Sequence, residues 1–358
     1  MSSSVIAITP GGRRLALEIG GACGFTVWLP KALCEPEDDA HSFTVLRELI
    51  CQRFQTDEAL VLIMACGIAI RILAPLLRNK QSDPAVVVMD EAGRFAISLL
   101  SGHWGGANAL AERLAQTVGA LPVITTATDA KGLYAVDLFA REIGVKPEPF
   151  SLIKTFNAAM LRGEKIAVFT DLPAGQLPCG NGLLFFPFSR FAVGEQFSYR
   201  ALLTNRLKIP GAGEGDLFLR PPNLFLGVGC RRGTLAVQIL TAIASVLERF
   251  NLAAASVAAL ASIDCKRQEE GLRLAAQELG LPVSFYKPEQ IKRVSVSCQQ
   301  SAFVLKAMGV GAVCEPTAIL AASGGRLLVS KQIMNGVTVA VAEAEYPWSA
   351  SDPAGKRR

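Results

Sequence analysis

The sequence predicts an α/β protein in which two three-layer α/β/α domains are joined by a small middle region. Three observations support this fold class. Apolar runs of strand length lead into turns and helices near both ends of the 358-residue chain. Hydrophobic residues make up 51% of the chain, as expected when parallel strands are buried on both faces. Between the two patterned stretches, a segment rich in proline, glycine and phenylalanine over 172–222 marks a boundary.

The first domain is expected over residues 1–139. Its expected elements, in order, are strands at 4–8 and 26–29 with a glycine turn and a short helix between them, a helix at 41–54, a strand at 59–67 leading into an apolar helix, two strands flanking the turn at 90–93, a helix at 107–118 and a strand at 122–128. The two runs beside the turn form either a hairpin or consecutive strands.

The middle region is expected over 140–222. One helix at 151–163 and one strand at 165–170 are readable in it, and its topology stays open.

The α/β pattern restarts in a C-terminal domain expected over 223–346. Its expected elements are a strand at 223–229 before a helix at 234–250, a strand at 256–262 before a helix at 266–280, a strand at 282–286 before a helix at 288–294, two short helices, and a hairpin across the MNG turn at 334–336. The tail, 347–358, is expected to be disordered.

Composition narrows the class of protein. The net charge of +5 and the pI near 8.7 are mild, which argues against a nucleic-acid partner and suits an anionic small molecule. The nine cysteines form no CxxC pair, so we expect reduced thiols and no metal site. Neither a signal peptide nor a membrane helix is expected, and the predicted location is the cytoplasm.

Several charged residues in the C-terminal domain are candidate substrate-binding groups. Arg231 and Arg232 follow a strand at the start of a helix, where backbone amides and guanidinium groups bind carboxylates; the alternative is a turn with two solvated arginines. Asp264 and Lys266 lie at the carboxyl end of the next strand, although a helix cap explains that place equally well. Glu315 near a helix start and Lys331 on a strand are further candidates, each of which alone reads as a surface charge.

The stretch SGHWGGAN, residues 101–108, is the strongest candidate for a catalytic centre. His103 is one of only two histidines, and an imidazole exchanges protons near neutral pH. Gly105 and Gly106 allow a ligand close approach to the backbone, while Ser101 and Asn108 offer hydrogen bonds, Asn108 to an oxyanion. The alternative is that His103 only holds the loop together.

A second polar stretch, TTATDA at 125–130, is expected at the same edge of the sheet. It would bring Asp129 close to His103 to orient the ring, with Thr126 contributing to substrate binding. Together the two stretches predict a site with His103 as the acid–base residue and Asp129, Ser101 and Asn108 as its partners.

Both ends of the chain resemble the cobalt-precorrin-5A hydrolase family of anaerobic cobalamin biosynthesis. The resemblance covers roughly 55–135 and 223–345, and it rests on SLLSGHWGGAN, PVITTATDA, GVGCRRGT, ASIDCKRQEEGL and VCEPTAILAASGGRLLVSKQIMNGVTVAVA. It implies a hydrolase that opens the δ-lactone of a contracted cobalt tetrapyrrole and releases acetaldehyde. The cobalt would arrive within the substrate, so no cofactor is implied.

The acidic arms of such a substrate require cations, for which Arg71 and Lys80 are additional candidates. Two other functions remain open. One is a non-catalytic carrier that passes tetrapyrrole intermediates to other enzymes of the pathway and would not need His103. The other is a nucleotide-binding enzyme, which the incomplete GxGxxG and the missing Walker lysine oppose. The oligomeric state is also open, a homodimer being one possibility.

Overall fold

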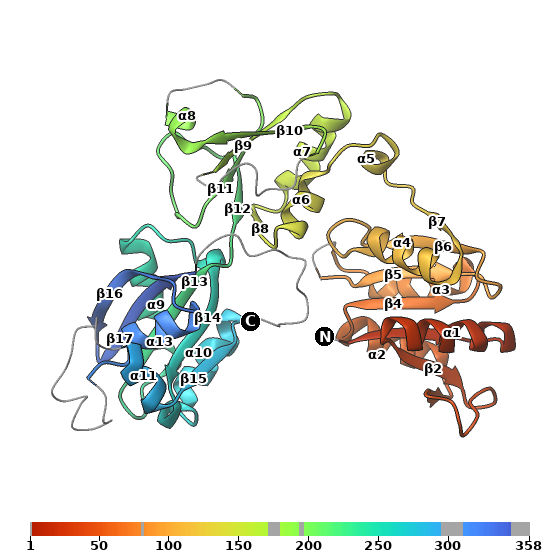
Figure 1. The fold of residues 1–358 in the computed structure, drawn as a ribbon, viewed down its shortest axis with the longest axis horizontal. Coiled ribbons are helices and arrows are strands. Elements are labelled where there is room, and N and C mark those ends of the chain that lie inside the picture. Colours follow the sequence, from red (N-terminus) through yellow and green to blue (C-terminus); the bar gives the residue numbers. More distant parts are fainter. Residues whose placement is uncertain (1, 80–81, 171–179, 193–196, 295–310, 345–358) are drawn as a thin grey trace. The chain divides into compact units, whose positions relative to one another are not determined.

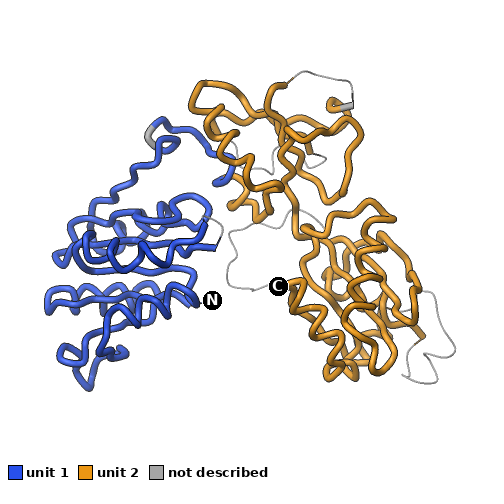
Figure 2. The backbone as a smooth tube through the Cα atoms, turned by 180° about the vertical axis from the view of Figure 1, so that it is seen from behind, with its two compact units in different colours: residues 1–138 blue, residues 139–358 orange. Residues whose placement is uncertain are grey.

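A computed structural model describes residues 2–79, 82–170, 180–192, 197–294 and 311–344 (Figure 1). The chain divides into two compact units, unit 1 over residues 1–138 and unit 2 over residues 139–358 (Figure 2). Lys80 and the tail at 347–358 lie outside the described residues. No helix in the described part of the chain is long and apolar enough to cross a membrane.

Unit 1 is built on a seven-stranded sheet in the order β3-β2-β1-β4-β5-β6-β7. Its strands are β1 (Ser3–Ala7), β2 (Thr26–Pro30), β3 (His41–Phe43), β4 (Ala59–Ile63), β5 (Ala85–Met89), β6 (Phe95–Leu100) and β7 (Leu121–Val123), and its helices include α1 (Pro10–Cys23), α2 (Leu46–Thr56), α3 (Cys66–Leu73), α4 (Ala107–Val118) and α5 (Ala127–Ala130). The first five strands are parallel, β6 pairs antiparallel with β5, and β7 runs parallel to β6. The hairpin alternative at residues 90–93 is therefore the one that the structure adopts.

Two helical layers cover this sheet, as the predicted α/β/α architecture requires. Alternate residues along β1, β4 and β5 face opposite ways. One set packs with α1 and α4, and the other packs with α2 and α3. Strands buried on both faces explain why the sequence shows continuous apolar runs there.

Several predicted elements of unit 1 begin or end differently. The strand expected over 59–67 ends at Ile63, and residues 66–67 already belong to α3. The expected glycine turn near residue 11 lies inside α1, because Thr9 caps the helix by accepting from the Gly12 amide and Pro10 occupies its first turn. The expected helix from residue 41 begins only at Leu46. His41 belongs to β3 and stacks on Trp28 of the neighbouring strand, with ring centroids 4.9 Å apart.

Another difference lies beside the candidate site. The strand expected over 122–128 ends at Val123, and residues 127–130 form the short helix α5. Side chains of this helix hydrogen-bond to His103 and Asn108, and these contacts favour a turn over continued strand pairing.

The N-terminal part of unit 2, which is the middle region of the chain, has its own five-stranded sheet in the order β10-β9-β11-β12-β8. Its elements are α6 (Val136–Glu142), which spans the boundary between the units, β8 (Lys146–Glu148), α7 (Leu152–Leu161), β9 (Ile166–Thr170), β10 (Leu183–Pro187), α8 (Phe188–Ala192), β11 (Arg200–Leu203) and β12 (Leu217–Arg220). All pairs are parallel except β12 with β8. The phenylalanines that obscured the sequence pattern form its core around Phe169.

The C-terminal part of unit 2 is a second α/β/α sandwich, with strand order β15-β14-β13-β17-β16. Its elements are β13 (Leu224–Cys230), α9 (Ala236–Arg249), β14 (Val257–Ile263), α10 (Glu270–Leu279), β15 (Val283–Tyr286), α11 (Pro288–Val294), α13 (Cys314–Ala321), β16 (Arg326–Met334) and β17 (Val337–Glu343). Helices α9 and α10 cover one face of the sheet, and α13 covers the other.

The predicted hairpin turn of this sandwich is confirmed, and a second glycine permits close packing. Asn335 and Gly336 both have positive φ, 48° and 83°, as the predicted tight hairpin turn requires. At Gly227, an added Cβ would lie 1.7 Å from the Cys314 carbonyl oxygen, so the start of α13 rests directly on the strand.

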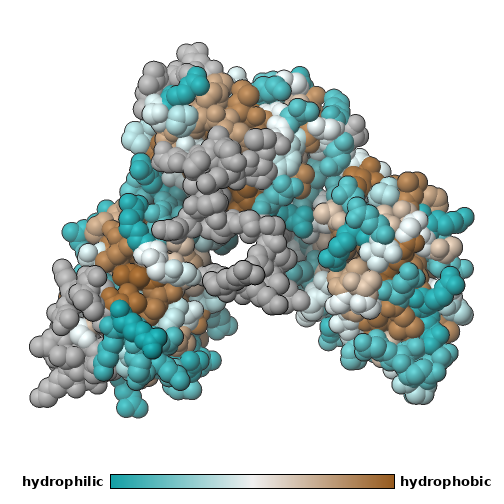
Figure 3. Space-filling model, viewed as in Figure 1, coloured by the Kyte–Doolittle hydropathy of each residue, from teal (hydrophilic) through white to brown (hydrophobic). Residues whose placement is uncertain are grey.

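The face in Figure 3 carries both hydrophilic residues and patches of apolar ones. Ile333 is the most exposed large apolar side chain of the described residues.

Candidate functional site

The strand directions bring the two polar stretches of unit 1 to one edge of its sheet. Because β7 runs parallel to β6, both strands end at the same edge, and the SGHWGGAN loop and α5 follow them there. The loop depends on local backbone requirements. Ser101 has a φ of 59°, and its hydroxyl donates to the Asp83 carbonyl at 3.0 Å. Gly106 has a φ of 89°, and a Cβ at Gly105 would lie 2.4 Å from the Cβ of Ser101. Both glycines are therefore required by the loop itself.

His103 lies between two carboxylates. Its Nε2 is 2.8 Å from Asp129 Oδ2 and 3.2 Å from Thr128 Oγ1, and its Nδ1 is 3.2 Å from the carboxylate of Asp137. The side chain of His103 is 9% exposed, that of Asp137 is 12% exposed and that of Asp129 is 30% exposed. Asp129 is therefore the member of this row that solvent and a substrate reach most easily.

The pKa of His103 is raised above its ordinary value of 6.5. Burial is the largest single influence and lowers the pKa, but the hydrogen bonds and charges of Asp137 and Asp129 together outweigh it. The imidazolium form is favoured, and in that form both ring nitrogens donate to the flanking carboxylates.

Asn108 connects the loop to α5. This buried side chain accepts from the Ser98 hydroxyl at 2.6 Å, and its Nδ2 donates to Thr126 Oγ1 at 3.1 Å and to Asp129 Oδ2 at 3.0 Å. Asn108 was expected to donate to an oxyanion, but both of its N–H groups donate within the protein. The Thr126 hydroxyl, expected to meet substrate, accepts one of them.

Asp137 was missed by the sequence analysis. It lies in the first turn of α6, 34 residues after His103, and is largely buried. The only local signal is an aspartate at the start of a helix, which is typical of an ordinary helix terminus. Only the fold brings it to the imidazole.

Of the two extra cations proposed in the first domain, Arg71 lies away from His103. Its Nη1 donates to the Gly67 carbonyl at 3.0 Å, at the start of α3 and therefore near the carboxyl end of β4. Because β6 runs opposite to β4 and β5, the SGHWGGAN loop lies at the other edge of the sheet. Lys80 lies outside the described residues.

In unit 2, the candidates at the carboxyl ends of β13 and β14 lie close together. Arg231 and Arg232 are exposed directly after β13. Lys266 is buried, and its Nζ is 3.1 Å from Glu269 Oε2, while Glu269 Oε1 accepts from the Gly233 amide at 2.6 Å. The charge of Lys266 is therefore largely matched inside the protein, whereas the two arginines present theirs to solvent.

The remaining candidates of unit 2 are engaged locally. Asp264 pairs with Arg267 at 2.9 Å in an exposed ion pair, and the pairing falls within a short turn that delays the start of α10 to Glu270. Glu315 is 1% exposed, and its Oε1 accepts from the backbone amide of Lys331 at 2.8 Å. These two predicted residues are thus in contact, but the carboxylate lies beneath the surface.

No group of three or more His, Cys, Asp or Glu side chains suited to a metal ion occurs in the described ranges. The row of Asp129, His103 and Asp137 in unit 1 offers groups that can take and give protons. It has an accessible carboxylate, a buried imidazole beside it and a second carboxylate behind the ring.

Three family models match the chain in order. They describe the cobalamin synthesis G N-terminal region, the cobalamin biosynthesis central region and the cobalamin synthesis G C-terminus, and they match residues 48–129, 134–221 and 224–342. The first match includes His103 and Asp129, and the third includes all the candidates of the C-terminal sandwich.

Two curated relatives are similar over most of the chain. A protein of Priestia megaterium named cobalt-precorrin-5A hydrolase is 33% identical, over 87% of this chain and 86% of its own. A protein of Salmonella typhimurium with the same name is 34% identical, over 96% of this chain and 98% of its own. Among solved structures, a putative cobalamin biosynthesis protein G homolog from Sulfolobus solfataricus is 22% identical with a TM-score of 0.41, covering 96% of this chain and 97% of that chain.

Proposed function

This chain belongs to the family of cobalamin synthesis G proteins, and from that premise we propose that it is a cobalt-precorrin-5A hydrolase. The reaction opens the δ-lactone of a contracted cobalt tetrapyrrole and then releases a two-carbon unit as acetaldehyde, giving cobalt-precorrin-5B. The observation that carries the site assignment is the hydrogen-bonded row Asp129–His103–Asp137 in unit 1.

The first step is attack of water on the lactone carbonyl. The water oxygen forms a bond to the carbonyl carbon while one water proton passes to a base. The acyl C–O bond then breaks, the leaving oxygen takes that proton from the base to become an alcohol, and the new carboxylic acid ionises in water. We assign the base to Asp129, because its carboxylate is the most exposed of the row. The sequence-based expectation gave this role to His103, but both nitrogens of that ring already face carboxylates.

His103 then acts as a positioning residue. As an imidazolium it donates to Asp129 at 2.8 Å, which fixes the orientation of the carboxylate and supports its negative charge. Asp137 holds the other side of the ring, and Asn108 donates to the same Asp129 oxygen. Asp129 is thus oriented by His103, and His103 by Asp137, as in other sites where a base is oriented by a third group.

The second step breaks a C–C bond. A base removes the proton of the new hydroxyl group, the C–C bond to the macrocycle breaks, and the electron pair passes to the macrocycle, which takes up a proton. Asp129, which has returned its proton to the leaving oxygen, is the proposed base here also. The substrate supplies its own cobalt, and we propose no further cofactor and a cytoplasmic location.

The direct test is incubation of the purified protein with the cobalt-precorrin-5A lactone while acetaldehyde is measured. Stoichiometric release over several turnovers supports the hydrolase. Binding of the lactone without acetaldehyde release would instead support the carrier function. The Asp129→Asn variant should bind the lactone and release acetaldehyde at least a hundredfold more slowly.

A further inference from the structure

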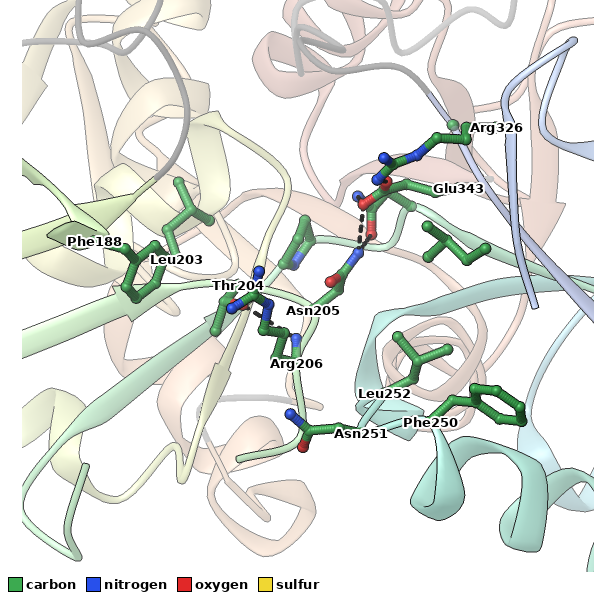
Figure 4. A pocket seen from close by; sticks show the side chains of 14 residues that line it. Phe188, Leu203, Thr204, Asn205, Arg206, Phe250, Asn251, Leu252, Arg326 and Glu343 are labelled. Carbon is green, nitrogen blue, oxygen red and sulfur yellow. Dashed lines mark hydrogen bonds and ion pairs between the residues drawn. The ribbon is translucent and has the colours of Figure 1, made fainter. Parts of the chain in front are cut away.

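A cavity of about 620 Å³ lies within unit 2 and takes no part in the mechanism above (Figure 4). Its walls come from the segment after β11, from the turn between α9 and β14, from the start of β16 and from the end of β17. The volume falls within the range of about 300–1,000 Å³ that is usual for small-molecule sites.

The two walls of the cavity are hydrogen-bonded to each other. The Leu207 amide donates to the Asn251 carbonyl at 2.9 Å, and the Ala253 amide donates to the Asn205 carbonyl at 2.8 Å. The side chain of Asn251 also bonds both the amide and the carbonyl of Lys208, at 2.8 and 3.0 Å. These bonds join the middle sheet to the C-terminal sandwich.

A buried arginine holds the cavity wall that follows β11. Arg220 is 2% exposed, and its guanidinium donates to the carbonyls of Thr204, Arg206 and Leu207 and to the carboxylate of Glu148. The segment lining the cavity therefore has a defined shape before any ligand enters, which lowers the entropic cost of binding.

The cavity has apolar walls on two sides. Leu203 and Phe188 lie on one side, and Leu252 and Phe250 lie on the other (Figure 4). Leu328 of β16 adds to the apolar surface. Such walls suit a flat apolar body better than a strongly hydrated one.

The charged groups at the cavity leave a surplus of positive charge. Glu343 is occupied, since its Oε1 accepts from Asn205 at 2.8 Å and its Oε2 pairs with Arg326 at 3.0 Å. Arg206 is exposed and points between the apolar walls, and no carboxylate among the described residues pairs with its guanidinium. An unpaired arginine beside apolar surface suits a carboxylate on an apolar body.

We propose that this cavity is a second tetrapyrrole site, which binds one edge of an acidic macrocycle with a peripheral carboxylate on Arg206. The macrocycle contributes the flat apolar body, and its acidic arms contribute the anion. The inference rests on the proposed function for its ligand class and not for its location. A nucleotide fits less well, because no glycine-rich turn lines the cavity to receive phosphates.

The test uses cobalt uroporphyrin III, an octacarboxylate tetrapyrrole, as the probe, and a tetracationic cobalt porphyrin and ATP as controls. Calorimetric titration should show binding that weakens about ten- to a hundredfold in Arg206→Gln. The matched control is Lys208→Gln, which removes an exposed charge two residues away from outside the cavity lining and should bind as the wild type does. Leu328→Trp, which fills the cavity, should also weaken binding while the melting temperature stays close to that of the wild type.

Hydrogen exchange locates the site. The probe should slow amide exchange in peptides covering 203–207 and 250–253 in the wild type but not in Arg206→Gln. The inference fails if protection is confined to 98–130, if Arg206→Gln and Lys208→Gln bind equally, or if only ATP gives an Arg206-dependent signal. Acetaldehyde release in the same preparations separates the two proposals. Intact turnover with no cavity protection removes this one alone, and cavity protection without turnover removes the hydrolase alone.

Discussion

Replacing Asp129 by asparagine tests the proposed division of labour in unit 1. The substitution keeps the shape of the side chain. In the wild type, His103 Nε2 and Asn108 Nδ2 lie 2.8 and 3.0 Å from Asp129 Oδ2, and the amide oxygen of asparagine can accept from the same two groups. What is lost is the negative charge and the ability to take a proton.

The expected cost in stability is small. A charge-assisted hydrogen bond contributes roughly 1.5–3 kcal/mol when it is buried. Asp129 is 30% exposed, so solvent screens the pair and we expect a loss of about 1 kcal/mol in the free energy of unfolding. General-base assistance is worth about 10²–10⁴ in rate, which corresponds to roughly 3–5 kcal/mol of transition-state stabilisation.

The assay follows acetaldehyde by its enzymatic reduction and measures kcat at saturating lactone, with circular dichroism to confirm folding. Asp39→Asn, a change at an exposed position elsewhere in unit 1, serves as the control and should leave the rate unchanged. A folded Asp129→Asn variant with kcat within tenfold of the wild type would refute the base assignment. If His103→Ala lost more rate than Asp129→Asn, the role of base would return to His103.

Three further outcomes follow from the same contacts. Asn108→Ala removes the acceptor of the Ser98 hydroxyl and one donor each to Thr126 and Asp129, so chemical denaturation should show a loss of about 2 kcal/mol. The raised pKa of His103 means that the folded chain binds its proton more tightly than the unfolded chain. The stability that this proton adds should therefore be fully present below pH 6.5 and be lost as the pH rises through the raised pKa. The free energies of unfolding of the wild type and His103→Ala, measured from pH about 5.5 to about 8.5, should converge as the pH rises. The Arg231→Gln, Arg232→Gln double variant should bind cobalt uroporphyrin more weakly than the wild type, and the difference in affinity should be larger at low salt than at high salt. Equal affinity of variant and wild type would show that both arginines are only solvated surface charges.

The alternation of strands and helices was readable from the sequence because it depends on local patterns. The apolar run at 59–63, the helix at 107–118 and the MNG turn each carry their signal within a few neighbouring residues. The same reasoning failed where a contact from elsewhere decided the element. His41 is a strand residue because Trp28 stacks on it, and residues 127–130 turn into a helix because their side chains meet the SGHWGGAN loop.

The middle region shows a second limit of local patterns. Its phenylalanines gave no period, because they pack against one another from several short elements around Phe169. An aromatic core assembled from separated segments has no signature within any one of them.

At the candidate site, the sequence by itself determined which chemistry was available. It placed a histidine in a glycine-rich loop and an aspartate after the next strand. The tertiary structure alone decided which residues lie together, because the antiparallel β6 takes the loop to the edge away from Arg71, and α6 brings Asp137 to the far side of the imidazole. The turn at 90–93 left a hairpin and consecutive strands equally open, and only the pairing of the whole sheet settled the direction of β6.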